Sequence, residues 1–198
     1  MGKKIVEGFK DQQKLEIFEK GLFNYNPMIF YVWKVGVNLA LRVSDVLNIK
    51  IEEAREYLEL GEYKSKDIKT GKRNHVKLNK NTIEAFERAL DLREKNINNN
   101  KDNRFLFVGM GNRSYSYPKS MTRQTVDRAF KYIVDNENLK IDVGTHTMRK
   151  TWGYMAYKKT NNIEIIMKRL NHSSPGTTMA YIGITNREVD ELVEELNI

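Results

Sequence analysis

The sequence predicts a mostly helical α+β domain with one small antiparallel sheet. Most of the chain carries apolar residues spaced three and four apart, bounded by residue types that begin and end helices. The stretch 49–78 instead shows short alternating runs around Lys69-Thr70-Gly71-Lys72, a sequence typical of a β-hairpin turn. The 198 residues suffice for one full core but would be cramped as two domains, so we expect a single domain over residues 1–198.

The composition indicates the class of binding partner and excludes some kinds of site. The net charge of +8 favours a polyanionic partner, nucleic acid first and an anionic membrane surface second. No apolar run approaches the roughly 20 residues of a membrane span, and the N-terminus carries no signal-peptide core, so we expect a cytoplasmic protein. The chain has no cysteine, which excludes disulfides and cysteine-based zinc sites.

The N-terminal part predicts a surface helix followed by a core helix. The spacing of apolar residues predicts the surface helix from Asp11 to Gly21, with the glycine as its end. Asn26 and Pro27 are suited to begin the next helix, which is apolar on nearly every face as far as Leu41. Arg42 therefore falls at a helix junction, where a side chain can be aimed.

The next part predicts the hairpin. Alternating runs are expected at Tyr57–Leu60, Tyr63–Ile68 and Arg73–Leu78. The last two runs would pair as antiparallel strands, which places Lys69 at the tip of the hairpin or just inside it.

The remaining part predicts further helices, each with its own start signal. We expect them after Asn81, after Ser120 or Thr122, after Thr145 and after Asn161. A short buried segment is expected at 105–108.

A short helix is also expected from Pro175 to Ile182, with Ser174 as its N-cap and Gly183 as its C-cap. A last helix, 186–197, follows.

Several polar residues stand out, although each has an ordinary explanation. His146 and Arg149 lie three apart, so a helix would present them on one face. Arg42 follows an apolar helix, where Asp45 could simply neutralise it. Tyr181 follows His172 by nine positions across a helix start, and alone it would be an ordinary half-buried aromatic.

The order of these elements changes their interpretation. Arg42 in Leu-Arg-Val-Ser-Asp, the hairpin Lys69, His146-x-x-Arg149, Leu-x-His172 and Tyr181 occur in that order. This arrangement resembles the catalytic domain of the tyrosine recombinases, the phage integrase family, over roughly residues 5–195. The resemblance implies the catalytic-domain fold of that family and an enzyme that cuts and rejoins DNA for integration, excision or inversion, as in phages and mobile elements.

The resemblance also implies a nucleophile and a set of phosphate ligands. Tyr181 would attack the phosphodiester and form a 3′-phosphotyrosyl link, so that neither ATP nor a metal or other cofactor is required. Arg42, Arg149 and His172 would bind the non-bridging phosphate oxygens. Asp45 would brace Arg42.

Proton transfer and DNA contacts would come from the remaining residues. Lys69 would protonate the leaving 5′ oxygen, although Lys66 or Lys72 could take this role in another hairpin register. His146 would act as general base or orient Tyr181 and the phosphate. Lys66, Lys72 and Arg73 are also expected to contact the DNA backbone, although a basic hairpin is usually a solvated face.

Some features depart from the family pattern or leave alternatives open. The family usually has glycine where this chain has Ala40 and Asn171. The N-terminal core-binding and arm-binding domains of many members are expected to be absent. We expect the protein to bind double-stranded DNA and to form a synaptic tetramer on it. In this tetramer the helix 186–197 would pack on a neighbouring protomer; the alternative is that it packs on its own chain. The alternatives for function are a type IB topoisomerase-like DNA relaxase and a non-catalytic DNA-binding regulator.

Overall fold

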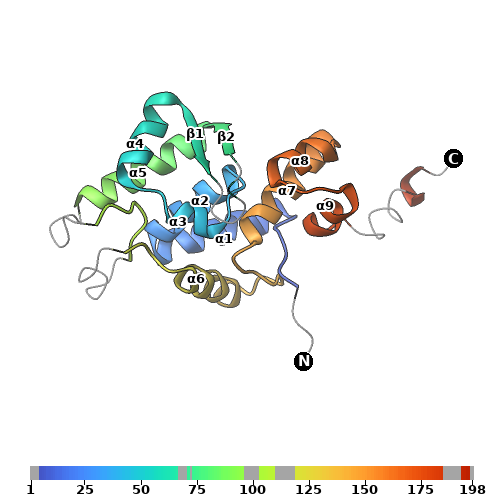
Figure 1. Cartoon of the computed structure of the whole chain (residues 1–198). Helices are drawn as coiled ribbons and strands as arrows, with labels where there is room; N and C mark the ends of the chain where they lie inside the picture. Colours follow the sequence, from blue (N-terminus) through green and yellow to red (C-terminus); the bar gives the residue numbers. More distant parts are fainter. Residues whose placement is uncertain are drawn as a thin grey trace.

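The computed structural model describes residues 5–66, 71, 73–95, 103–109, 119–184 and 193–196. Within these residues the chain is mostly helical, with one antiparallel pair of strands, as the sequence predicts (Figure 1). The helices are α1 Gln12–Tyr25, α2 Pro27–Asn38, α3 Val43–Leu47, α4 Ile51–Leu60, α5 Lys80–Lys95, α6 Arg123–Asn136, α7 Thr147–Thr160, α8 Ile163–Leu170 and α9 Pro175–Ile182. The strands are β1 Glu62–Lys66 and β2 Arg73–Lys77. No helix of the described residues is long and apolar enough to cross a membrane.

Helix α2 is the centre of the main core and packs against α1, α5 and α7. An aromatic cluster of Phe9, Phe18, Trp33 and Phe130 fills the space between α2 and its neighbours, with ring centroids 4.7–5.8 Å apart. Aromatic pairs of this kind add to the stabilisation that burial alone provides. The prediction of a central core helix after Asn26 is therefore confirmed.

Two predicted helix ends differ in the structure. Helix α1 continues past Gly21, because the glycine lets α1 approach Ile133 of α6 closely: a Cβ would lie 2.7 Å from Ile133 Cγ2. Helix α2 ends at Asn38 rather than near Leu41, because Ala40 has a left-handed backbone with φ of 49°. Arg42 consequently lies in a turn, immediately before α3.

The prediction of an alternating run at Tyr57–Leu60 was wrong, since these residues end helix α4. The helix begins where the Glu53 carboxylate accepts a hydrogen bond from the Lys50 N–H, and it ends at Gly61 with φ of 66°. Ala54 and Tyr57, three positions apart, supply its buried face. An alternation of apolar and polar residues over only four positions does not distinguish a strand from the end of a helix.

The hairpin prediction is confirmed. Strands β1 and β2 pair antiparallel, with Glu62 opposite Lys77 and Lys66 opposite Arg73. The hairpin lies beside α4 and above α2 (Figure 1).

Three helix starts are settled by their hydrogen bonds. Asn79, not Asn81, caps α5, since its Oδ1 accepts from the Thr82 N–H. Thr122 caps α6. Asn162, not Asn161, caps α8, because Asn161 has a left-handed backbone that closes α7.

Helices α7, α8 and α9 form the side of the molecule that carries the candidate site (Figure 1). Here α8 and α9 enclose a small second core of Ala40, Ile166, Leu170 and Ile182. The expected helix 186–197 lies outside the described residues, except that 193–196 are helical.

Candidate active site

The structure brings together five residues that the sequence singles out, from four separate segments. Arg42 lies in the turn before α3, His146 and Arg149 at the start of α7, His172 between α8 and α9, and Tyr181 near the end of α9. Lys69 and Lys72 lie outside the described residues. Lys66 and Arg73 stand opposite each other at the strand ends nearest the hairpin turn.

Local sequence determines where α9 begins and ends. Ser174 Oγ accepts a hydrogen bond from the Thr177 N–H, Pro175 occupies the first turn, and Gly183 closes the helix with φ of 79°, as predicted. Helix α9 also packs closely on α7. A Cβ on Gly153 would lie 2.5 Å from Ile182 Cγ2, so only glycine permits this separation between the two helices.

Tyr181 is surrounded by groups that contact its hydroxyl and its ring. The hydroxyl lies 3.3 Å from His146 Nδ1. The His172 ring packs edge-on at 4.9 Å between centroids, and Lys150 Nζ lies 4.8 Å from the ring centroid, within range of a cation–π interaction. Burial raises the pKa of the Tyr181 phenol, while the charge and hydrogen bond of Arg149 oppose this rise.

Both histidines have lowered pKa values. Burial is the main cause for each, and the nearby arginines add to it: Arg149 for both, with Arg42 contributing less. A lowered pKa leaves an imidazole neutral at pH 7, so that His146 Nδ1 can accept a proton from the hydroxyl it faces. His172 Nδ1 lies 3.2 Å from Thr178 Oγ1, which orients its ring.

Arg149 is 4% exposed and is held by main-chain carbonyls from two sides. Its Nη1 donates to the Ala40 carbonyl at 2.7 Å and its Nη2 to the Leu170 carbonyl at 2.8 Å. A guanidinium has five N–H donors, so three remain beyond these two bonds, and one of them serves the hydrogen bond to Tyr181. The side chain is thus fixed in place with donors left for an anion.

Arg42 lies beside Asp45, as the sequence predicts. Its Nη1 is 4.0 Å from Asp45 Oδ2, and its side chain is 20% exposed whereas that of Asp45 is 4% exposed. Desolvation and the charge of Arg149 lower the pKa of Arg42, and Asp45 opposes this. The two guanidinium groups are close enough to interact electrostatically, so they concentrate positive charge beside Tyr181.

The two positions where this chain lacks the family's glycine both have left-handed backbones. Ala40 has φ of 49° and Asn171 has φ of 56°. Glycine adopts this conformation without strain and asparagine tolerates it, whereas alanine does so at a cost of roughly 1–2 kcal/mol. Both left-handed residues lie shortly before a candidate site residue, Ala40 before Arg42 and Asn171 before His172.

Sequence reasoning missed two cations near the site. Lys150 follows Arg149 directly, and its contact with the Tyr181 ring could have been suspected from that adjacency. Arg169 of α8 donates from Nη2 to the Leu39 carbonyl, 130 positions away, a contact that no local pattern reveals.

Among the described residues, no three His, Cys, Asp or Glu side chains gather where they could hold a metal ion. The prediction that the reaction needs no metal stays a prediction.

Comparisons with known proteins agree with this architecture. The family model described as "Phage integrase family" matches residues 29–188. The chain is 32% identical over 184 residues to a probable integrase/recombinase, YoeC, of Bacillus subtilis strain 168, a match that covers 91% of both chains. It is 28% identical over 95 residues to a tyrosine recombinase of Thermosipho africanus strain TCF52B, covering 48% of this chain and 32% of that protein.

Solved structures show the same fold. The XerA recombinase matches with a TM-score of 0.73 at 19% identity, over 98% of this chain and 67% of that one. The XerH site-specific recombinase bound to palindromic difH substrate matches with a TM-score of 0.71 at 20% identity, over 98% of this chain and 54% of that one. With its family model, its relatives and its fold in agreement, the chain belongs to the phage integrase family of tyrosine recombinases.

Proposed function

We propose that this protein is a site-specific DNA recombinase that cuts and rejoins DNA strands through a 3′-phosphotyrosyl intermediate on Tyr181. The observation that carries the proposal is the hydroxyl of Tyr181, 3.3 Å from His146 Nδ1, on the side of the molecule where Arg42 and Arg149 concentrate positive charge. The proposal thus combines a nucleophile, a neutral base and two phosphate ligands in one site.

The proposed step exchanges one phosphodiester bond for another. The Tyr181 oxygen attacks the phosphorus, the bond from phosphorus to the 5′ oxygen breaks, and the 3′ phosphate remains on the tyrosine. The phenol proton passes to His146, and the leaving 5′ oxygen takes a proton from a general acid, for which Lys69 is our candidate. Reversal by a 5′ hydroxyl of another strand rejoins the DNA, so that the number of phosphodiester bonds is conserved.

The cations supply the electrostatic part of this step. Negative charge accumulates on the non-bridging oxygens as the tyrosine attacks, and donors already fixed in place stabilise it without rearrangement. Arg149 meets this requirement because two main-chain carbonyls hold it. Arg42 and His172 complete the proposed set, and Asp45 steadies Arg42.

The proposed partner is double-stranded DNA, bound with self-association into a tetramer. Supporting this, a λ integrase tetramer bound to a Holliday junction matches the chain with a TM-score of 0.64 over 91% of its length. Contacts to the DNA backbone from Lys66, Lys72 and Arg73, and docking of the segment 186–197 on a neighbour, belong to the same proposal.

A suicide substrate tests the proposed function. Duplexes tiled in single-nucleotide steps across the DNA on both sides of the gene would each carry a nick just 3′ of the tested phosphate, so that the short fragment released by cleavage diffuses away. We expect an SDS-stable protein–DNA adduct with the wild type and none with Tyr181→Phe. Tyr157→Phe, on α7, is the matched control and should retain the adduct. Binding without an adduct would support the non-catalytic regulator instead.

Strand exchange distinguishes a recombinase from a relaxase. If the duplex that yields the adduct is present in two differently labelled copies, the proposed recombinase produces hybrid duplexes. A relaxase would remove supercoils from a plasmid without producing hybrids.

A further inference from the structure

Two arginines from different helices hold consecutive carbonyls of the turn between α2 and α3. Arg169 of α8 donates from Nη2 to the Leu39 carbonyl, and Arg149 of α7 donates from Nη1 to the Ala40 carbonyl at 2.7 Å. Leu39 and Ala40 are each 1% exposed, so neither carbonyl has ready access to water. A buried carbonyl that loses its donor is destabilised by its own desolvation.

This turn leads directly to Arg42. Ala40 has φ of 49°, a conformation that an alanine retains only where the surrounding structure holds it. On one side the turn is tied to α2 by the Leu41 N–H, which donates to the Gly36 carbonyl at 3.0 Å. On the other side, the two arginines tie it to α7 and α8. The backbone that carries Arg42 is therefore held by contacts from outside its own segment.

The position of Arg169 is electrostatically unfavourable, which argues for a specific role. Desolvation and the neighbouring charge of Arg149 lower its pKa to about 10, while Tyr63 of β1 opposes this shift. A buried apolar side chain at this position of α8 would avoid both costs. The guanidinium instead joins α8 to the Arg42 turn and lies near the first strand of the hairpin.

We infer that Arg169 is a positioning residue, which sets the location of Arg42 by fastening the Leu39–Ala40 turn to helix α8. The inference rests on the proposed function, since it assigns Arg169 an effect on the cleavage step. In this inference Arg169 acts through Arg42, because its Nη2 donates to the main-chain carbonyl of Leu39 in the turn that carries Arg42.

The test follows cleavage of the suicide substrate in single turnover. Two quantities are measured: the rate constant at saturating protein, and the protein concentration that gives half of this rate constant. Arg169→Met retains an unbranched apolar stem but removes the donors. We expect its rate constant to fall about 10- to 100-fold, with the half-saturating concentration changed by no more than about twofold. Arg169→Lys, which retains one charged donor, should lose only about threefold.

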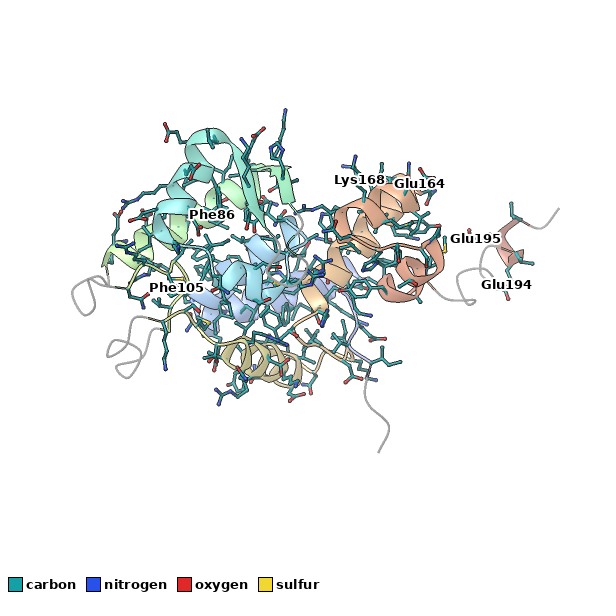
Figure 2. The ribbon with its side chains drawn as sticks, in the orientation of Figure 1. Phe86, Phe105, Glu164, Lys168, Glu194 and Glu195 are labelled. Atoms are coloured by element: carbon teal, nitrogen blue, oxygen red, sulfur yellow. The ribbon has the colours of Figure 1, made fainter. Side chains whose placement is uncertain are left out.

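Two controls separate positioning from general damage. Lys168→Met alters the adjacent residue, which projects from the outer face of α8 (Figure 2), and should behave as the wild type. A double-mutant cycle tests whether Arg169 acts through Arg42. In an Arg42→Lys background, Arg169→Met should lower the rate constant by no more than about threefold, because its effect requires the native Arg42.

The remaining outcomes decide between the positioning inference and the proposed function. Equal losses in the two backgrounds, or a loss confined to the half-saturating concentration, would overturn positioning through Arg42. If Arg169→Met does not fold, Arg169→Lys decides: a wild-type rate constant overturns the inference, and a lowered one at unchanged half saturation supports it. No adduct from the wild type overturns the proposed function and this inference together. An adduct from the wild type and an equally fast one from Arg169→Met overturns the inference alone.

Discussion

His146 Nδ1 lies 3.3 Å from the hydroxyl of Tyr181, although the two residues are 35 positions apart in the chain. Two local features make this distance possible: the caps that position α9, and the close packing of α9 on α7 at Gly153. Tyr181 therefore lies beside His146 of its own chain, an arrangement that the spacing of residues in the sequence leaves open.

The first prediction concerns the pH dependence of cleavage. The kcat/KM of an enzyme reports the pKa values of the free enzyme. Burial and nearby cations lower the pKa of His146 below the ordinary value of about 6.5. If His146 accepts the phenol proton, kcat/KM should stay level down to about pH 6.5 and decline only at lower pH. His146→Ala should be slower by a factor on the order of 100 or more and should lose this acidic decline. A decline that persists in His146→Ala would assign it to another group.

The second prediction concerns stability and pH. His146 and His172 both have lowered pKa values in the folded protein, so the unfolded chain binds more protons as the pH falls through about 6.5. The free energy of unfolding should therefore decrease as the pH is lowered from 7 to 5. Urea denaturation at a series of pH values measures this slope. His146→Gln and His172→Gln should each make the slope shallower, and an unchanged slope in both variants would contradict the assignment.

The third prediction concerns the contact between α7 and α9. Gly153→Ala would place a Cβ 2.5 Å from Ile182 Cγ2, which forces α9 away from α7. We expect a loss of about 1–3 kcal/mol in the free energy of unfolding and a slower cleavage step, since Tyr181 moves with its helix. Gly176→Ala, in α9 itself, is the control: nothing lies within 4 Å of the added Cβ. Equal cleavage rates in the two variants would show that the separation of the helices does not position Tyr181.

The fourth prediction concerns the left-handed residue before His172. Asn171 has φ of 56°, so Asn171→Gly should change the free energy of unfolding by no more than about 0.5 kcal/mol, whereas Asn171→Val should lower it by about 1–2 kcal/mol. Asn136→Val, in the last turn of α6, measures the same substitution on a helical backbone and should cost less. Urea denaturation supplies all three values. A cost at Asn171 no greater than that at Asn136 would contradict the role of the left-handed backbone.

The sequence predicted the features that depend on neighbouring residues. The bounds of α9 follow from Ser174, Pro175 and Gly183, because caps act through bonds that span a single turn. The hairpin was predicted from its alternating runs and its turn residues, and the start of α2 from Asn26 and Pro27. The helix α4 was missed because Tyr57–Leu60 is short enough to fit either periodicity.

Features that depend on distant parts of the chain were not predictable in this way. Gly21 does not end α1, because its lack of a side chain serves the packing of α1 on Ile133. The bond from Arg169 to the Leu39 carbonyl likewise joins segments that only the folded chain brings together. Residue types and their order thus indicated the candidate site, whereas the contacts that hold it in place required the structure.

The most direct test of the proposed function identifies the residue that becomes linked to DNA. Trypsin releases residues 170–187 as one peptide. Of the ten tyrosines in the chain, this peptide contains only Tyr181. After nuclease digestion of the adduct from the suicide substrate, mass spectrometry should find the nucleotide remnant on this peptide, attached to Tyr181. A remnant on a peptide that carries any other tyrosine would contradict the assignment of Tyr181 as the nucleophile.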